Sequence, residues 1–296
     1  MQPRRPPARA EGHAPVHGYG LYWRSVGDGN GRAPVLMLHG GPGMSHDYLA
    51  PFEDLAGFGY RVVFYDQLGC GRSERARDPI DYSIDRDVAD LDELRRRLGL
   101  GRVHLIGSSY GGLLAIAYTL AHPEGVRTLV SASGLADVPL AVREMQRLVR
   151  SLPPEMTAAI AEGDASGTYD SPAYAAAVAE FYRRHLCRLE PWPPEVTYTL
   201  ANVSLPKYGR MNGPNEFTIV GTIRDWSVTD RLGEIRLPTL ITVGRYDEVT
   251  PAVAESIHRG IPGSELHQFG ASSHLAFWEE RADYFALLRR FLDRHG

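Results

Sequence analysis

The sequence predicts an α/β fold in which a mostly parallel central sheet is flanked by helices and carries an inserted helical cap. Three observations lead to this prediction. Short apolar runs of strand-forming residues alternate with segments of helical periodicity, which is typical of a parallel sheet covered on both faces. Several of these runs end in glycine-rich turns. A long middle segment shows helical spacing and no strand pattern.

The first part of the core is expected over residues 17–134. Residues 1–16 mix proline, arginine and alanine, and we expect them to form a disordered tail. A hairpin is predicted around 19–26, with its turn in the segment GDGNG. Nearly continuous apolar runs then predict buried strands, and helical spacing predicts the helices between them. The predicted strands are 33–38, 60–65, 102–106 and 126–132, and the predicted helices are 46–56, 83–98 and 113–121.

The helical cap is expected over residues 135–230, because this segment lacks strand periodicity. Proline-rich joints such as LPP and EPWPP separate its helical segments. These predicted segments are 141–152, 171–188 and 215–226. The second part of the core, 231–296, resumes with a strand at 237–243. It continues with a strand that ends near residue 269 and closes with an amphipathic helix at 279–294.

Bulk composition narrows the function classes. The chain has 296 residues, 43% hydrophobic and 23% charged, which is enough to bury a core without a disulfide or a metal. A net charge of −4 gives no broad basic field for nucleic acid or for an anionic membrane. No apolar run has the length of a secretion signal or of a membrane span, and Cys70 and Cys187 fit no disulfide or ligand spacing. We therefore expect a cytoplasmic protein with a peptide or small-molecule substrate, and the oligomeric state stays open, compatible with a monomer.

The segment GSSYG, residues 107–111, predicts a serine nucleophile. It fits the pattern G-x-S-x-G, in which the serine stands on a strained strand-to-helix turn and small residues two positions away relieve crowding. A predicted buried strand precedes it and an apolar helix follows. The pattern makes Ser109 the nucleophile, because a frame centred on Ser108 would place Ile106 and Tyr110 at the crowded positions.

A serine hydroxyl needs a histidine to accept its proton, and the histidine needs a carboxylate to fix its tautomer. In the α/β-hydrolase fold these residues follow one another as serine, acid and histidine. Asp247 follows the strand at 237–243, and His274 follows the next strand. We predict that they complete a catalytic triad with Ser109. The alternatives are a turn aspartate at 247 and a helix-capping or partly buried histidine at 274.

Other residues compete for these roles. His104 lies within a predicted buried strand and is interpreted as a core residue, and His122 precedes a proline at a helix end. Asp66 ends a strand at the same edge of the sheet, but the segment DQLGCGRS is rich in turn residues, so we interpret Asp66 as a residue that organises this loop.

The segment HGGPG, residues 39–43, predicts one half of an oxyanion hole. Flexible backbone beside the nucleophile can supply the second N–H donor, so we assign the hole to the amides of Gly41 and Tyr110. The alternative is an ordinary glycine turn. The segment GCGRS lacks the third glycine of a dinucleotide-binding motif. The sequence also contains no G-K-[ST] phosphate loop and no H-E-x-x-H metal-binding motif. We therefore expect no cofactor and no metal.

Taken together, HGGPG, DQLGCGRS, GSSYGG, YDEVTP and the late His274 resemble the proline iminopeptidase family. The likeness is closest to the tricorn-protease interacting factor branch, since GSSYGG replaces the usual GxSWGG and the cap carries MNGPNEF. The resemblance implies an exopeptidase that releases an N-terminal residue, proline or another, often apolar, residue, from short peptides or amino-acid amides. It also implies acidic cap residues that hold the free amine.

Two acids fit that amine-binding role. Glu248 stands beside the triad acid, and Glu216 lies in the cap segment NEF. Neighbouring carboxylates repel unless a cation lies between them, and a substrate α-ammonium would supply that cation. The alternatives are that Glu248 faces solvent and that Glu216 starts a helix, where acids are favoured.

Rival functions use the same fold. A tailoring hydrolase that cleaves an amide or ester of a secondary metabolite, or an amino-acid amidase, would use the same triad, because the cap alone sets specificity. An epoxide hydrolase or dehalogenase would need an aspartate in place of Ser109. A non-catalytic receptor on this fold is expected to lack a triad residue.

Overall fold

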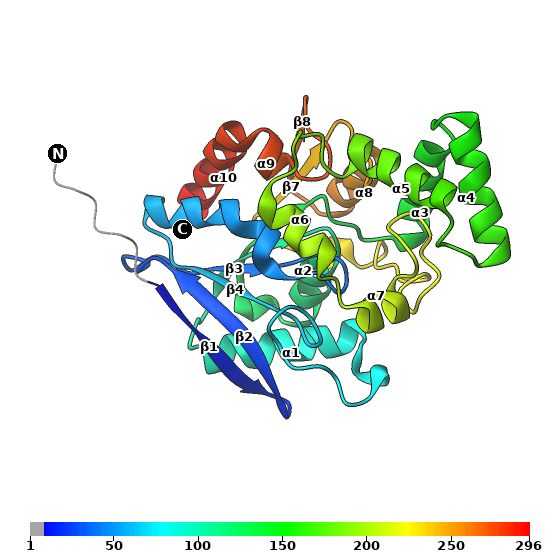
Figure 1. The fold of residues 1–296 in the computed structure, drawn as a ribbon. Helices are drawn as coiled ribbons and strands as arrows, with labels where there is room; N and C mark the ends of the chain where they lie inside the picture. Colours follow the sequence, from blue (N-terminus) through cyan, green and yellow to red (C-terminus); the bar gives the residue numbers. More distant parts are fainter. Residues whose placement is uncertain (1–8) are drawn as a thin grey trace.

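The computed structural model describes residues 9–296, which fold around one eight-stranded sheet (Figure 1). The strands lie in the order β1-β2-β4-β3-β5-β6-β7-β8. They are β1 (Arg9–Val16), β2 (Tyr19–Val26), β3 (Val35–Leu38), β4 (Val62–Tyr65), β5 (Val103–Ser108), β6 (Val126–Ala132), β7 (Thr239–Gly244) and β8 (Glu265–Phe269). From β4 to β8 all neighbouring strands are parallel, whereas β1 and β2 join antiparallel at one edge. The predicted α/β-hydrolase architecture is confirmed.

Helices cover both faces of the sheet because the central strands are apolar on both sides. In β3, Leu36 and Leu38 face one core, whereas Val35 and Met37 face the other. The first core is closed by α1 (Ile84–Arg97), α2 (Tyr110–Ala121) and α8 (Pro251–Gly260). The second is closed by the 3₁₀ helix η1 (His46–Phe58), α9 (Ala276–Glu279) and α10 (Arg281–His295). Three short 3₁₀ turns, η2 (Pro79–Asp81), η3 (Pro123–Gly125) and η4 (Leu232–Glu234), lie in the connections.

The cap helices lie between β6 and β7 in the chain and beside the sheet in space (Figure 1). They are α3 (Val138–Val149), α4 (Pro154–Ser166), α5 (Pro172–His185), α6 (Pro194–Ala201) and α7 (Leu205–Met211). The cap is bonded to loops at the carboxyl ends of the strands. The amide of Ser204 donates to the carbonyl of Gly43, after β3, and the amide of Tyr48 donates to the hydroxyl of Thr199. The cap therefore covers the edge where the predicted site lies.

The start of the chain differs from the prediction. Residues 9–16 form β1, so the expected disordered tail is wrong for that stretch, and residues 1–8 lie outside the described residues. The hairpin turns at His17 and Gly18, not at GDGNG. Both residues have positive φ, 44° and 86°, as a two-residue type I′ hairpin turn requires. Histidine is uncommon in this conformation, so the sequence at this position did not indicate a hairpin turn.

The cap segment 215–226 is also not helical, contrary to prediction. The side chain of Asn215 accepts hydrogen bonds from the amides of Phe217 and Thr218, at 3.0 and 2.9 Å. An asparagine that bonds its own downstream backbone offers an alternative to the helix. This turn fixes the direction of Glu216, the residue between Asn215 and Phe217.

Two absences are relevant to the site. No helix in residues 9–296 combines the length and the apolar character that a membrane crossing needs. Within the same residues, no three His, Cys, Asp or Glu side chains gather closely enough to hold a metal ion.

Candidate active site

The backbone at Ser109 is strained, with φ 58° and ψ −124°, between the end of β5 and the start of α2. The flanking glycines make this turn sterically possible. A Cβ atom at Gly107 would lie 1.9 Å from the carbonyl oxygen of Gly111, and one at Gly111 would lie 2.1 Å from that of Leu38. Ser108 is fully buried as the last residue of β5. The geometry agrees with the choice of Ser109 over Ser108.

Asp247 and His274 meet at the carboxyl edge of the sheet, after β7 and β8. The ring Nδ1 of His274 lies 2.7 Å from Oδ1 of Asp247, and the same oxygen accepts from the amide of Val249 at 2.8 Å. Asp247 is therefore held in one orientation. Ser109 and His274 line one cavity, so the structure brings all three predicted triad residues together.

The protonation of His274 depends on the surrounding carboxylates. Burial disfavours the charged ring, but the charges of Asp247 and Glu248, with a smaller contribution from Glu216, outweigh it and raise the pKa of His274 to about 9. Oε1 of Glu248 lies 3.8 Å from Nε2 of His274. Nε2, the nitrogen that must accept a proton if His274 acts as a base, therefore lies close to the carboxyl group of Glu248.

The two predicted amine-binding acids line the same cavity. Glu248 is 1% exposed, which contradicts the alternative of a solvent-facing residue, and its Oε2 has no hydrogen-bond partner among the described residues. Oε1 of Glu216 accepts a 2.7 Å hydrogen bond from the hydroxyl of Tyr208. Burial raises the pKa of both carboxyls. Two partly desolvated acids therefore lie next to Ser109, ready to bind a cation.

A second cavity adjoins the first. Ser109, Glu216 and Glu248 line both. The first cavity is completed by Met44, Tyr48, Leu186, Val196, Thr199, Leu200, His274 and Leu275. The second is completed by Gly41, Tyr110, Leu113, Leu135, Met145, Asn212, Ile219, Ile223 and Val249. The nucleophile and the two acids therefore stand where two mainly apolar cavities meet.

The predicted oxyanion-hole residues lie at the second cavity. Gly41 has φ 120°, and a Cβ atom there would lie 2.5 Å from the amide nitrogen of Gly43, so only glycine fits. Tyr110 is the first residue of α2, and its amide therefore has no acceptor within the helix. A Cβ atom at Gly40 would lie 2.9 Å from that of Ser109, which shows how closely the HGGPG segment approaches the serine.

The competing residues have other roles. His104 is buried in β5 and its Nδ1 lies 2.9 Å from the hydroxyl of Thr128, while burial lowers its pKa to about 4.

Asp66 accepts hydrogen bonds from the amide and ring of His46 and from the amide of Arg72. Although burial opposes ionisation, these bonds lower the pKa of Asp66 to about 2. Its interpretation as a loop organiser is confirmed.

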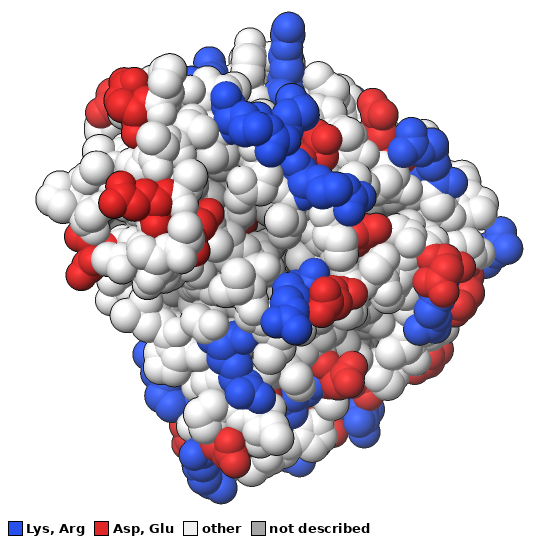
Figure 2. All heavy atoms as spheres, turned by 90° about the vertical axis from the view of Figure 1, so that its right-hand side faces the viewer, with Lys and Arg blue, Asp and Glu red and all other residues white. Residues whose placement is uncertain are grey.

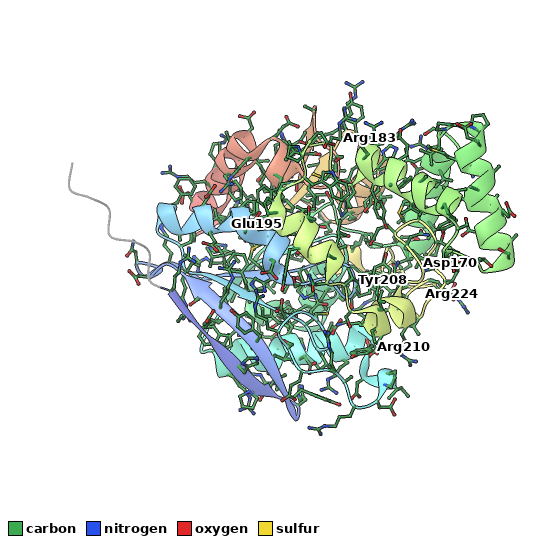
Figure 3. All side chains as sticks on the ribbon, in the orientation of Figure 1. Asp170, Arg183, Glu195, Tyr208, Arg210 and Arg224 are labelled. Carbon is green, nitrogen blue, oxygen red and sulfur yellow. The ribbon has the colours of Figure 1, made fainter. Side chains whose placement is uncertain are left out.

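Sequence reasoning missed contacts that come from the cap. The carbonyl of His185, at the end of α5, accepts hydrogen bonds from the amides of both Glu248 and His274, at 3.2 and 3.1 Å. Tyr208, which bonds Glu216, lies on the inner side of α7, whereas Arg183 and Arg224 project from the outside of the cap (Figure 3). A lone histidine at a helix end and a tyrosine in a short helix carry no motif that could have singled them out.

Comparison with known proteins shows the family of the chain. The α/β hydrolase fold family model matches residues 33–281. The proline iminopeptidase of Saccharolobus solfataricus is 46% identical over 286 residues, covering 96% of this chain and 92% of that protein. The Thermoplasma volcanium proline iminopeptidase is 46% identical over 287 residues, covering 96% of this chain and 97% of that protein.

Solved structures give the same result. VinJ is 36% identical with a TM-score of 0.94, over 98% of this chain and all of that one (100%). The proline iminopeptidase of Mycobacterium smegmatis is 34% identical with a TM-score of 0.90, over 97% of this chain and 98% of that one. The tricorn-protease interacting factor branch stays a prediction, since none of these names specifies it. The chain belongs to the proline iminopeptidase family of α/β-hydrolase-fold aminopeptidases.

Proposed function

We propose that the chain is a serine aminopeptidase that releases the N-terminal residue of short peptides or amino-acid amides, with Ser109, Asp247 and His274 as its triad. One observation carries this proposal beyond a general hydrolase. Glu248 is buried and Glu216 is half-buried, and both lie at the junction of the two cavities, which Ser109 also lines. Two carboxylates in a desolvated site favour a cation, and an α-ammonium is the cation that an N-terminal residue brings.

The reaction proceeds through an acyl-enzyme. Oγ of Ser109 attacks the carbonyl carbon of the N-terminal residue while Nε2 of His274 takes the hydroxyl proton, and Asp247 stabilises the imidazolium. The amides of Gly41 and Tyr110 bind the oxyanion. The tetrahedral intermediate collapses, the C–N bond breaks, and the leaving amine receives the proton from His274. Water, deprotonated by the same ring, then hydrolyses the ester and restores Ser109.

The two cavities bind different parts of the substrate. Gly41 and Tyr110 line the second cavity, so the carbonyl oxygen and the side chain of the N-terminal residue belong there. His274 lines the first, which receives the leaving amine. The aliphatic wall of the second cavity favours proline or another apolar residue at the N-terminus. The cap closes both cavities to all but short substrates.

The apolar wall of the first cavity favours a second candidate function. Leu186, Val196 and Leu200 surround the space for the leaving group, which suits an apolar amine or alcohol as well as a peptide. The same triad would then act as a tailoring hydrolase on an amide or ester of a secondary metabolite, whereas an amino-acid amidase would share the free-amine requirement of the aminopeptidase. The two functions differ in whether the acyl group must carry a free amine.

A hydrolysis assay distinguishes the two functions. Its substrates are aminoacyl aryl amides, each tested with a free and with an N-acetylated amine, together with simple esters. We expect the wild type to cleave the free amines much faster. Glu216→Gln and Glu248→Gln remove charge at nearly constant shape, and should each lower kcat/KM for the free amine ~30-fold, without lowering it for the acetylated substrate. Glu180→Gln is the matched control, because Glu180 pairs with Arg183 and Arg184 on the outside of the cap.

Equal cleavage of free and acetylated substrates, unchanged in both Gln variants, would contradict the amine site. The tailoring hydrolase would then be the better assignment.

A further inference from the structure

We infer that Lys207 of the cap is a positioning residue that holds the two halves of the oxyanion hole in place. It does so through Asp87 and Tyr110 on one side and through Gln67 and His39 on the other. This inference rests on the proposed function for the chemistry of the hole, but not for the identity of the substrate.

Lys207 is the only lysine in the sequence, and all other Lys or Arg positions are arginine. Its side chain is 0% exposed although it comes from α7, a short helix of the cap. Nζ donates to Oδ1 and Oδ2 of Asp87 at 2.8 and 2.9 Å. Burial disfavours the ammonium, but the charge of Asp87 outweighs it and raises the pKa of Lys207. A charged ammonium therefore reaches from the cap into the core.

The first branch leads to the residue after the nucleophile. Oδ2 of Asp87, in α1, accepts a 2.7 Å hydrogen bond from the hydroxyl of Tyr110. Burial and the charge of Asp87 raise the pKa of Tyr110 well above its usual value, so its hydroxyl stays a donor. The side chain that Asp87 fixes thus belongs to the same residue whose amide is assigned to the oxyanion hole.

The second branch leads to the segment that contains Gly41. Nζ of Lys207 also donates to Oε1 of Gln67, at 3.3 Å, and Nε2 of Gln67 donates to the carbonyl of His39 at 2.8 Å. The amide of Gln67 donates to Nε2 of His39 at 3.0 Å. The proton of the His39 ring is then on Nδ1, 3.0 Å from the carbonyl of Gly40, and burial keeps the ring neutral by lowering its pKa to about 4.

The arrangement suits a lysine for a geometric reason. An ammonium has three donors, and here three acceptor oxygens of Asp87 and Gln67 surround it, whereas the planar fork of arginine fits two parallel acceptors. A buried ion pair is poor evidence for stabilisation, because apolar residues of similar volume often stabilise a core equally well. Fixed donors aimed at developing charge are, in contrast, a large catalytic effect. We therefore assign the network a role in positioning the donors of the oxyanion hole, and not in stabilising the core.

Tyr110→Phe tests the inference, because it removes one bond and leaves the ion pair intact. Tyr118→Phe is the matched control. Tyr118 lies on the same helix, α2, and its hydroxyl donates to Asp92 of the same partner helix, α1, at 2.9 Å. Both variants lose a hydrogen bond from α2 to an aspartate of α1, and Tyr118→Phe also loses a bond from Arg95, so the control removes at least as much, but away from Ser109.

We expect Tyr110→Phe to lower kcat ~10-fold with little change in KM, since a misplaced donor weakens binding of the transition state alone. Affinity for an aminoacyl boronate, which forms a tetrahedral adduct on the serine, should fall by the same factor, and affinity for the released amino acid should not. Tyr118→Phe should keep the kcat of the wild type. Wild-type kcat and boronate affinity in Tyr110→Phe, or equal losses in both variants, would overturn the inference.

Lys207→Met alone would leave Asp87 buried without its partner, so the second test is the pair Lys207→Met with Asp87→Leu, which removes both charges. We expect this double variant to fold and to show the same selective loss of kcat and boronate affinity. Undiminished kcat in the folded double variant would overturn the inference. Kinetics on a simple aryl ester keep this result separate from the amine site, since ester turnover needs the oxyanion hole and no free amine.

Discussion

Ser109 occupies a backbone conformation that an L-amino acid adopts rarely, at a cost of about 1–3 kcal/mol. The strain is maintained because β5 and α2 are both buried and because Gly107 and Gly111 allow the chain to turn without a clash. Ser109 thereby stands at the carboxyl end of the strand, where it lines the same cavity as His274. The neighbouring Ser108 is buried in the strand and has no such position.

Ser109→Ala should abolish turnover of an aminoacyl aryl amide, by roughly 10⁴-fold or more, because no acyl-enzyme can form. Thermal unfolding should be almost unchanged, since alanine retains the Cβ atom that the turn already accommodates. Ser108→Ala is the control, and it should keep substantial activity. Turnover by Ser109→Ala near the wild-type rate would refute the assignment of the nucleophile.

The pKa of about 9 at His274 predicts a substrate-dependent pH profile. Only the neutral ring accepts a proton, so turnover of a substrate without a free amine should rise with pH through about 9. A bound α-ammonium offsets the charges of Glu216 and Glu248, which raise that pKa. The acid limb of kcat should therefore lie roughly 1–2 pH units lower for the free amine than for its acetylated analogue. Profiles for the two substrates check this, and coincident limbs would contradict it.

The same shift has a consequence for stability. The pKa of His274 in the folded protein is above the value of ~6.5 expected when unfolded. Its contribution to stability is therefore complete below pH ~6.5 and is lost as the pH rises through about 9.

At the scale of single residues, the site was predictable where local sequence determines geometry. The spacing of Gly107, Ser109 and Gly111 reflects contacts within a few residues, and the triad order reflects the strands they follow. Lys207 and Tyr208 were not predictable in the same way. Their partners are distant in the chain and belong to different elements, so no local pattern records the contact.

Among the elements, the junction of β5, α2 and β3 leaves no room for added volume. A Cβ atom at Gly111 would lie 2.1 Å from the carbonyl oxygen of Leu38, and this oxygen belongs to β3, which is paired with a strand on each side. Gly57, in η1, has no atom within 4 Å of the corresponding position.

Gly111→Ala should therefore destabilise the fold by about 3 kcal/mol, measured as the free energy of unfolding in urea. Gly57→Ala should change it by less than ~0.5 kcal/mol. Equal stability of the two variants would show that α2 can move away from the sheet, and would weaken the steric account of the elbow.

Elements were predicted well where burial on both faces leaves a continuous apolar run, as at 126–132, which is β6. Predictions failed where a side chain redirects the backbone. At 215–226 the periodicity of a helix is present, but Asn215 bonds the next amides and stops the helix from forming. At the N-terminal edge, β1 consists of residues with weak strand preference, and pairing with β2 determines its structure.

At the scale of the molecule, the cap and the core form the site jointly. The core supplies Ser109, Asp247 and His274, and the cap supplies Glu216 together with the carbonyl of His185 that accepts from two active-site loops. The overall architecture could be predicted because alternating strands and helices admit few connections. How the cap is seated could not, since that depends on buried polar contacts between distant segments.

The outer face of the cap side shows basic and acidic side chains interspersed with wide uncharged areas (Figure 2). Because the single lysine of the chain is buried, the side chains drawn in blue on this surface are all arginine. Reagents that acylate or methylate side-chain amines therefore find no accessible target while α7 stays docked on the core. Modification of Lys207 requires α7 to leave the core, so the rate of that reaction would measure how often this helix undocks.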